Sequence, residues 1–305
     1  MESRRDRMRM DAEGDRLSVL PDDLILQILS FMEISLDFNS SSQFLKSGLD
    51  MLSEFVTHVL SRRNNQVQLS SFNLYLRKTF GQDVALRIMN HAFSLNVQQL
   101  NVTCRFTYHS SSYEENPGIP YSLSGSLTLK HLTLNWYSCV DHMILTSTRE
   151  FSSLTTLHLY YITLYDGFLS MYPNLENLTL NCCKIKGSEV LSICHPRLSN
   201  LTLENGDCVN VVTPQLKNLT ISNYFGGYQI SAPELASLII KGQCMFSTDG
   251  FPSLEKAQFS LHNIKMQSRS DDSNVIRLLQ EFRNVQFLSL SEEVIQVYYK
   301  IFFVR

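Results

Sequence analysis

The pattern Leu-x-x-Leu-x-Leu recurs along this chain. Two residues separate the first leucine from the second, and one residue separates the second from the third. Leu129, Leu132 and Leu134 show the pattern clearly. Residues two apart in a β-strand point to the same face, so the closing pair of each copy predicts two inward-facing strand positions. Copies or softened copies begin at Leu69, Val97, Leu129, Leu154, Leu175, Leu198, Leu216, Leu235, Leu254 and Val285.

The spacing of these copies predicts the architecture. Successive copies start 18 to 32 residues apart, which is typical of a leucine-rich-repeat solenoid. Stacked repeats place their strands parallel, and we expect the return segments between strands to be short helices or irregular chain. The pattern therefore predicts an α/β leucine-rich-repeat solenoid with a curved parallel sheet over residues 69–291.

Polar residues occupy the strand positions that alternate with the aliphatic ones. Solenoids usually bind their partners through the concave face, so these positions are candidates for a protein-binding surface. We expect hydrogen bonding to dominate there, with Tyr160 and Trp136 as aromatic anchors. The same residue types also suit any exposed strand, and that alternative stays open. The candidate residues are His131, Thr156, His158, Tyr160, Asn177, Thr179, Asn200 and Thr202.

The segments outside the repeats predict smaller elements. Residues 1–15 are polar and charged, and we expect a disordered tail. Residues 36–68 are expected to form a linker and a helix that caps the solenoid. Residues 292–305 form a C-terminal tail that is either a last cap or an exposed strand. The apolar stripe of the capping helix consists of Leu45, Leu49, Leu52, Val56 and Val59.

Composition narrows the function further. The net charge is −3, so the chain has no broad basic field to attract nucleic acid, and we expect no nucleic-acid partner. We also expect no membrane span, because no long apolar run occurs. The seven cysteines are odd in number and lack a Cys-x-x-Cys pair, and the charged N-terminus is unlike a signal peptide. These features predict an intracellular protein, in the cytoplasm, the nucleus or both.

Motifs for catalysis are missing from the sequence. It contains no Gly-x-Gly-x-x-Gly loop, no P-loop, no His-Glu-x-x-His pair and no recognisable nucleophile–base set. We therefore expect a protein that is not an enzyme and that needs no cofactor or metal. His131 and His158 lie in neighbouring repeats, where a metal site is conceivable but an ordinary pair of strand histidines is favoured.

The segment from Leu17 to Phe31 resembles the start of an F-box. Together with a following helix around residues 54–63 and the irregular leucine repeats, it resembles the plant F-box/leucine-rich-repeat family. Members of that family are substrate adaptors of SCF ubiquitin ligases. The resemblance implies that the F-box docks on a Skp-type linker subunit and that the repeats select a target protein. The family's docking contacts correspond here to Leu20, Pro21, Leu24, Ile25, Ile28 and Leu29.

The F-box resemblance covers only residues 16–35. A typical F-box continues into a helix with a Val-Leu-Ser-Lys-Arg-Trp-like motif, whereas Ile34 to Asn39 resembles the loop that normally follows the F-box. Two hypotheses follow. The chain is either a substrate-recognition adaptor of a cullin-type ligase, or a repeat scaffold that binds proteins and has lost ligase docking.

Overall fold

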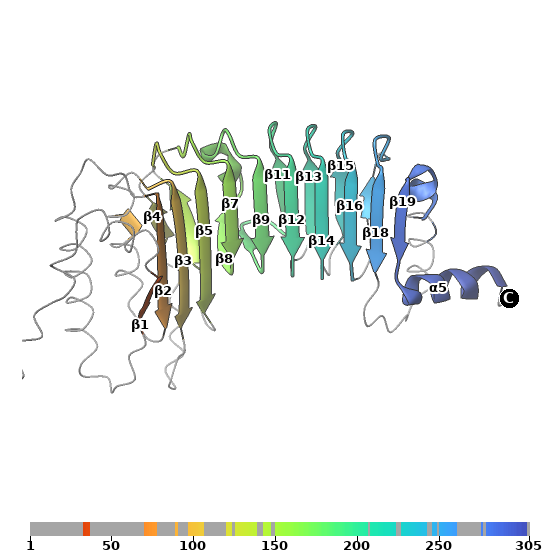
Figure 1. Ribbon diagram of the computed structural model, residues 1–305, viewed down its shortest axis with the longest axis horizontal. Helices are drawn as coiled ribbons and strands as arrows, with labels where there is room; N and C mark the ends of the chain where they lie inside the picture. The colour runs from red at the N-terminus through yellow and green to blue at the C-terminus, as the bar shows by residue number, and fades with distance from the viewer. Residues whose placement is uncertain are drawn as a thin grey trace, which may run out of the picture.

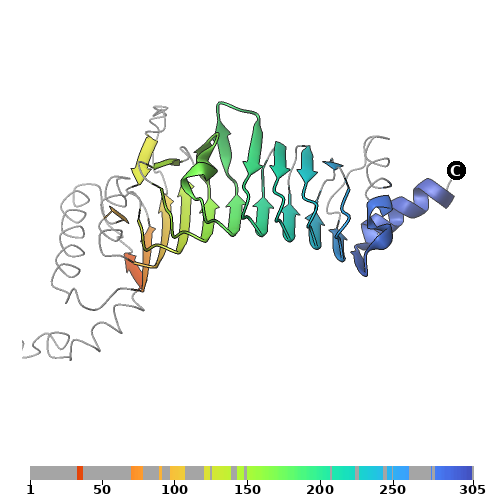
Figure 2. The ribbon, with the colours of Figure 1, turned by 90° about the horizontal axis from the view of Figure 1, so that it is seen from above.

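The chain folds into a gently curved ribbon of stacked coils, with a large sheet along one side and smaller sheets behind it (Figure 1, Figure 2). The predicted tail at 1–15, the docking segment of the partial F-box and the predicted capping helix lie outside the described residues. The computed structural model describes residues 33–36, 70–77, 89–90, 97–106, 120–123, 126–138, 143–147, 150–206, 208–223, 227–242, 246–248, 250–260, 276 and 279–303.

The large sheet contains eleven strands, each parallel to its neighbours, in the order β1-β2-β3-β5-β7-β9-β12-β14-β16-β18-β19. Ten of them contain the ten predicted aliphatic pairs, so the predicted parallel solenoid is confirmed. Figure 2 shows that the large sheet lies along the concave side of the curved ribbon. The bounds are β1 Glu33–Leu36, β2 Ser71–Arg77, β3 Gln99–Phe106, β5 His131–Ser138, β7 Thr156–Tyr160, β9 Asn177–Asn181, β12 Asn200–Glu204, β14 Asn218–Ser222, β16 Ser237–Lys241, β18 Lys256–Ser260 and β19 Phe287–Leu290.

The core is a set of aliphatic rows that run from coil to coil. Leu157 pairs in register with Leu178, and Leu178 with Leu201, so equivalent leucines stack directly. The first leucine of each copy is buried with them, as Leu154 and Leu175 show. Burying one such side chain stabilises the fold by about 2 kcal/mol, and each copy from the one that begins at Val97 to the one that begins at Leu254 supplies three. In the last copy Leu288 is 47% exposed. The repeating sequence therefore produces one continuous core.

Strand β1 lies in a segment where the sequence pattern does not reveal a strand. Residues 16–35 are the predicted partial F-box and residues from 36 onward the predicted linker, but Glu33–Leu36 pairs with β2 in parallel register, Ile34 opposite Leu74. The solenoid sheet thus starts before residue 69, the predicted boundary. Only Ile34 and Leu36 of this segment follow the aliphatic alternation, which is too short a signal to predict a strand without its neighbour.

The return segments differ from the predicted helices or irregular chain, because many of them are strands. They form two further parallel sheets of four strands each, in the orders β10-β8-β6-β4 and β11-β13-β15-β17. A coil of about 20 residues leaves only a few residues for its return, and an extended strand spans that distance with the fewest residues. The bounds are β4 Pro120–Leu123, β6 Met143–Ser147, β8 Ile162–Tyr165, β10 Lys184–Lys186, β11 Val190–Cys194, β13 Cys208–Val212, β15 Tyr228–Ser231 and β17 Phe246–Thr248.

Helical structure is sparse in the described part of the chain. Two 3₁₀ turns occur, η1 at Phe168–Met171 and η2 at Phe282–Asn284, and the α-helix α5 spans Glu292–Phe303. The C-terminal segment is therefore a helix and not an exposed strand. Val294 and Val297 bury one side of α5, while Ile295 and Tyr299 remain exposed.

A left-handed residue follows the strand in five successive coils of the large sheet. These residues are Tyr161, Cys182, Asn205, Asn223 and Gly242, with φ of 60°, 52°, 53°, 53° and 105°. Each backbone N–H donates to the carbonyl that ends the next strand, for example Tyr161 to Asn181 at 2.9 Å. The left-handed turn redirects the chain out of the sheet and still satisfies that donor. Glycine and asparagine adopt this conformation readily, whereas other residues lose about 1 kcal/mol.

His195 joins two coils through a buried, neutral ring. Its Nε2 lies 3.0 Å from the carbonyl oxygen of Tyr172, and its Nδ1 accepts the backbone N–H of Arg197 at 3.3 Å. This pairing assigns the proton to Nε2. Burial lowers the pKa of His195, the Tyr172 carbonyl raises it in part, and the charge of Arg197 lowers it further. The neutral ring is therefore the form that the fold requires.

Replacing Leu178 by alanine is expected to lower the free energy of unfolding by about 3 kcal/mol, since the variant leaves a cavity between two leucine rows. Leu178 is only 1% exposed, and Thr179 beside it points outward. The matched Thr179→Ala variant should change stability by about 0.5 kcal/mol or less. Urea denaturation followed by circular dichroism measures both, and equal losses would contradict the assigned inward and outward faces.

Acid is expected to destabilise the fold through His195. An unfolded histidine has a pKa of about 6.5, so the unfolded state binds more protons than the folded state as the pH falls through that value. Stability is thus present above this range and lost below it. His195→Gln, which cannot titrate, should show a smaller difference in urea midpoint between about pH 7.5 and about pH 5.5. An unchanged pH dependence in this variant would refute the role of His195.

Candidate functional site

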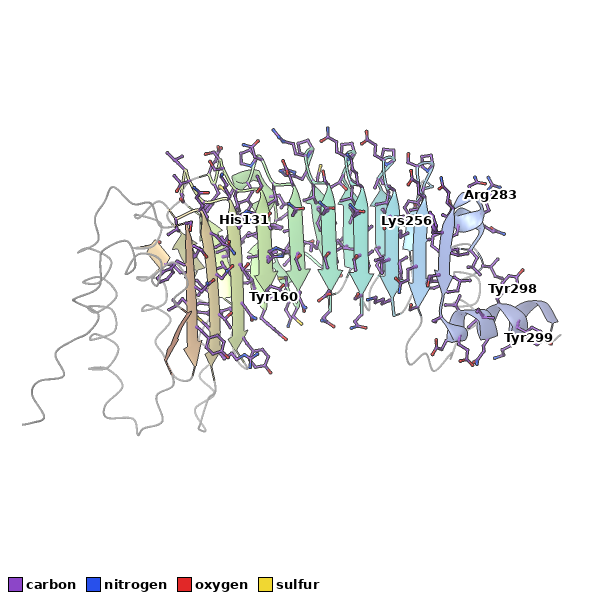
Figure 3. The ribbon with its side chains drawn as sticks, viewed as in Figure 1. His131, Tyr160, Lys256, Arg283, Tyr298 and Tyr299 are labelled. Carbon is purple, nitrogen blue, oxygen red and sulfur yellow. The ribbon has the colours of Figure 1, made fainter. Side chains whose placement is uncertain are left out.

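The outward face of the large sheet carries the residues that the sequence predicts as a binding surface. The register of β5, β7, β9 and β12 aligns their side chains in rows across the strands. Figure 3 shows His131, Tyr160 and Lys256 on this face. Whether the surface binds a partner stays a prediction. The residues placed here as predicted are His131, Thr156, His158, Tyr160, Asn177, Thr179, Asn200 and Thr202.

Asparagine side chains form a hydrogen-bonded ladder along one row of the face. Asn218 Nδ2 donates to Asn200 Oδ1 at 2.6 Å, and Asn200 Nδ2 donates to Asn177 Oδ1 at 2.6 Å. Asn177 Nδ2 continues the ladder to Thr156 Oγ1 at 3.2 Å. These amides satisfy one another across the coils. Part of the predicted binding row is therefore structural, because each of these amides already donates a hydrogen bond to the neighbouring coil.

A second, shorter set of contacts lies at the carboxyl ends of the strands. Asn181 Nδ2 donates to Glu204 Oε2 at 2.6 Å, and Asn205 Nδ2 donates to Asn181 Oδ1 at 3.0 Å. Asn181 is the last residue of β9, and Asn205 is the left-handed residue that follows β12. One carboxylate oxygen of Glu204 is consequently engaged by its neighbour, while the carboxylate keeps its negative charge.

His131 and His158 come from adjacent strands, but on different rows: His131 pairs with Thr156, and His158 with Thr133. Burial lowers the pKa of His158, and the positive charge of His131 lowers it further. A neutral His158 could accept a metal ion, yet the described residues contain no group of three His, Cys, Asp or Glu side chains placed to hold one. The pair has the geometry of two strand histidines.

The prediction that Trp136 is an aromatic anchor of the face is wrong. It follows Asn135 on β5, so the strand alternation turns its side chain inward, and it is fully buried in the core. Tyr160 does lie on the outward face, half-buried, and burial raises the pKa of its hydroxyl, as does the nearby carboxylate of Glu204. The sequence pattern predicts His131, Thr133 and Asn135 as the outward positions of β5. It does not show that the strand continues to Ser138, and Trp136 lies in that continuation.

An aromatic and cationic cluster lies at the carboxyl edge of the sheet, where the sequence pattern does not predict one. The rings of Tyr137 and Tyr161 meet edge to face, with centroids 4.9 Å apart and an interplanar angle of 87°. Arg105 on β3 pairs in register with Tyr137 on β5. Tyr137 is 44% exposed, and Arg105 is also exposed. The left-handed corner at Tyr161 brings these side chains together, and periodicity does not predict such a corner.

Several predicted features lie outside this face. The proposed docking contacts Leu20, Pro21, Leu24, Ile25, Ile28 and Leu29 fall outside the described residues. The five described cysteines, Cys104, Cys182, Cys183, Cys194 and Cys208, are all free thiols. Within the described ranges, no helix is long and apolar enough to cross a membrane.

Two curated proteins of Arabidopsis thaliana are similar to this chain. A putative F-box/FBD/LRR-repeat protein is 27% identical, and the match covers 92% of this chain and 66% of the relative. An F-box/LRR-repeat protein is also 27% identical, and the match covers 79% of this chain and 77% of the relative. The chain thus spans about two thirds of the length of the first. No protein-family model and no solved structure matches the chain.

These two matches extend over most of the chain and support its resemblance to the plant F-box/leucine-rich-repeat family. Together with the solenoid fold they support a protein-interaction role based on the repeats.

Breaking the asparagine ladder is expected to weaken the coil stack. Asn200→Ala removes the amide that both accepts from Asn218 and donates to Asn177, and we expect a loss of about 1–2 kcal/mol in the free energy of unfolding. Thr202→Ala, two residues further along β12 on the same outward face, should cost about 0.5 kcal/mol or less. Chemical denaturation distinguishes the two, and an Asn200 variant as stable as the Thr202 variant would contradict a stabilising ladder.

Proposed function

We propose that the chain is a substrate-recognition adaptor of an SCF-type cullin E3 ubiquitin ligase, and that it binds target proteins through the outward face of its large sheet. The main support is the eleven-stranded parallel sheet, which provides a long open face in a chain similar to two F-box/LRR-repeat proteins. Its N-terminal segment, with Leu24 and Ile28, would dock on a Skp-type linker subunit. This role requires no catalytic residue or cofactor and places the protein in the cytoplasm or nucleus.

One observation favours an alternative, a repeat scaffold that has lost ligase docking. Strand β1 begins at Glu33, directly after the F-box-like segment, and is already paired with β2 of the solenoid. The second half of a typical F-box therefore has no place between the docking segment and the sheet. Under this alternative the face still binds proteins, but the linker subunit does not join.

Co-purification of the tagged full chain from plant extract tests the adaptor proposal. We expect the Skp-type linker with wild-type protein and its loss with Ile28→Asp, because a charged side chain opposes burial in an apolar docking contact. Leu127→Asp is the matched control: Leu127 is 76% exposed and lies away from the docking segment, so this variant should retain the linker. No linker with folded wild-type protein would refute the adaptor role and leave the scaffold.

A further inference from the structure

The outward face divides into a polar majority and one aromatic and cationic cluster. Most face positions are Asn, Thr or Ser, and the asparagine ladder already uses its amides within the fold. Binding energy at protein interfaces is concentrated in tyrosine, tryptophan and arginine side chains. On this face such side chains gather at the carboxyl ends of β3, β5 and β7. We define the edge cluster as Arg105, Tyr137, Tyr160 and Tyr161.

The geometry of the edge cluster holds two of its rings in place and leaves the Arg105 guanidinium exposed. Tyr137 and Tyr161 support each other edge to face at 4.9 Å, so neither ring has to be ordered on binding. Burial raises the pKa of Tyr161, and so do the charge of Cys182 and a side-chain hydrogen bond with it, so the Tyr161 hydroxyl stays protonated and is engaged within the fold. Arg105 is exposed and forms no ion pair with any acidic residue in the part of the chain that the structure describes.

The charges of the face favour an anionic partner. Its described cationic side chains are Arg105, Lys241 and Lys256, the last of which lies over the ring of Phe287 at 5.6 Å. The acidic side chain among the described face positions is Glu204, and Asn181 holds it at 2.6 Å. Acids elsewhere near the sheet, Glu176 and Glu255, precede the strands and so lie at the opposite edge. Lys256 opens β18 and lies at that opposite edge as well, so the described carboxyl edge of the face carries two cations, Arg105 and Lys241, and one carboxylate, Glu204, on a chain with a net charge of −3.

We infer that the edge cluster is the binding hot spot of the face and that it accepts an acidic segment of a partner protein. Arg105 would bind a partner carboxylate, the three tyrosine rings would pack against the adjoining backbone, and Tyr137 and Tyr160 would donate hydrogen bonds from their hydroxyls. The inference rests on the proposed use of this face for protein binding and adds the position and the chemical class of the ligand. The cluster favours protein over nucleic acid because the overall charge is negative.

Arrays of short synthetic peptides test the inference with the full chain as the soluble partner. Three sets share the same variable positions and differ only at the fixed ones, which are Asp and Glu, Asn and Gln, or Lys and Arg. We expect the acidic set to retain the protein and the other two sets to retain less. Single-stranded RNA serves as a fourth probe. Preference for the amide or basic set, or tighter binding of RNA, would overturn the inference.

Variants locate the site on the strongest acidic peptide, by fluorescence anisotropy. Arg105→Ala and Tyr137→Ala should each weaken binding about tenfold. Arg283→Ala and Tyr299→Ala are the matched controls. They remove side chains of the same two types at the C-terminal end of the molecule (Figure 3), and they should leave binding unchanged. Tyr137→Phe retains the ring contact and should fall between wild type and Tyr137→Ala. Equal binding by Arg105→Ala and wild type would overturn the inference.

A face-blocking variant separates failure of the inference from failure of the proposed function. Thr179→Arg places a large side chain at the middle of the face, on β9, outside the edge cluster. Peptides or proteins that are lost with Thr179→Arg but retained by Arg105→Ala would support binding by the face and refute the edge cluster. Binding that survives both variants would refute the use of the face itself.

Discussion

The structure depends on the stacking of aliphatic side chains from one coil onto the equivalent side chains of the next. A single coil exposes its leucines on both sides and cannot bury them alone. Parallel register places Leu157, Leu178 and Leu201 in one row, so each coil covers its neighbour. The backbone supports the same alignment, because the carbonyl of Thr155 accepts the N–H groups of both Glu176 and Asn177. Apolar burial and hydrogen bonding thus require the same coil spacing.

This constraint also determines what the outward face can do. Rows of equal residues on adjacent strands bring asparagine amides within 2.6 Å of one another, and they bond among themselves. A repeating polar face is consequently stable but has few free donors. Sites for a partner arise where the repetition breaks. Tyr137, on the longer β5, and Tyr161, at a left-handed corner, form such a break beside Arg105.

The N-terminal edge of the sheet links the fold to the question of ligase docking. Because β1 pairs with β2 directly after the F-box-like segment, the solenoid and the docking segment are separated by almost no chain. A bound linker subunit would therefore lie close to the first coil. The short connection is also the feature that favours the scaffold alternative.

The sequence by itself determined the ten strands with apolar pairs and their parallel order, because a period-two pattern that returns along the chain favours one stacked arrangement. It also determined the inward and outward positions, except in β19, where Leu288 is exposed because, among the described residues, no further coil covers it. It also determined the outward location of residues such as Thr179 and Tyr160. Tertiary structure decided the features that depend on a neighbouring coil. Strand β1 exists through its pairing with β2, and the extended returns follow from the short length of each coil. Trp136 turns inward because β5 continues beyond its leucine pair. The tautomer of His195 and the contact between Tyr137 and Tyr161 depend on residues more than 20 positions away, which no local pattern encodes.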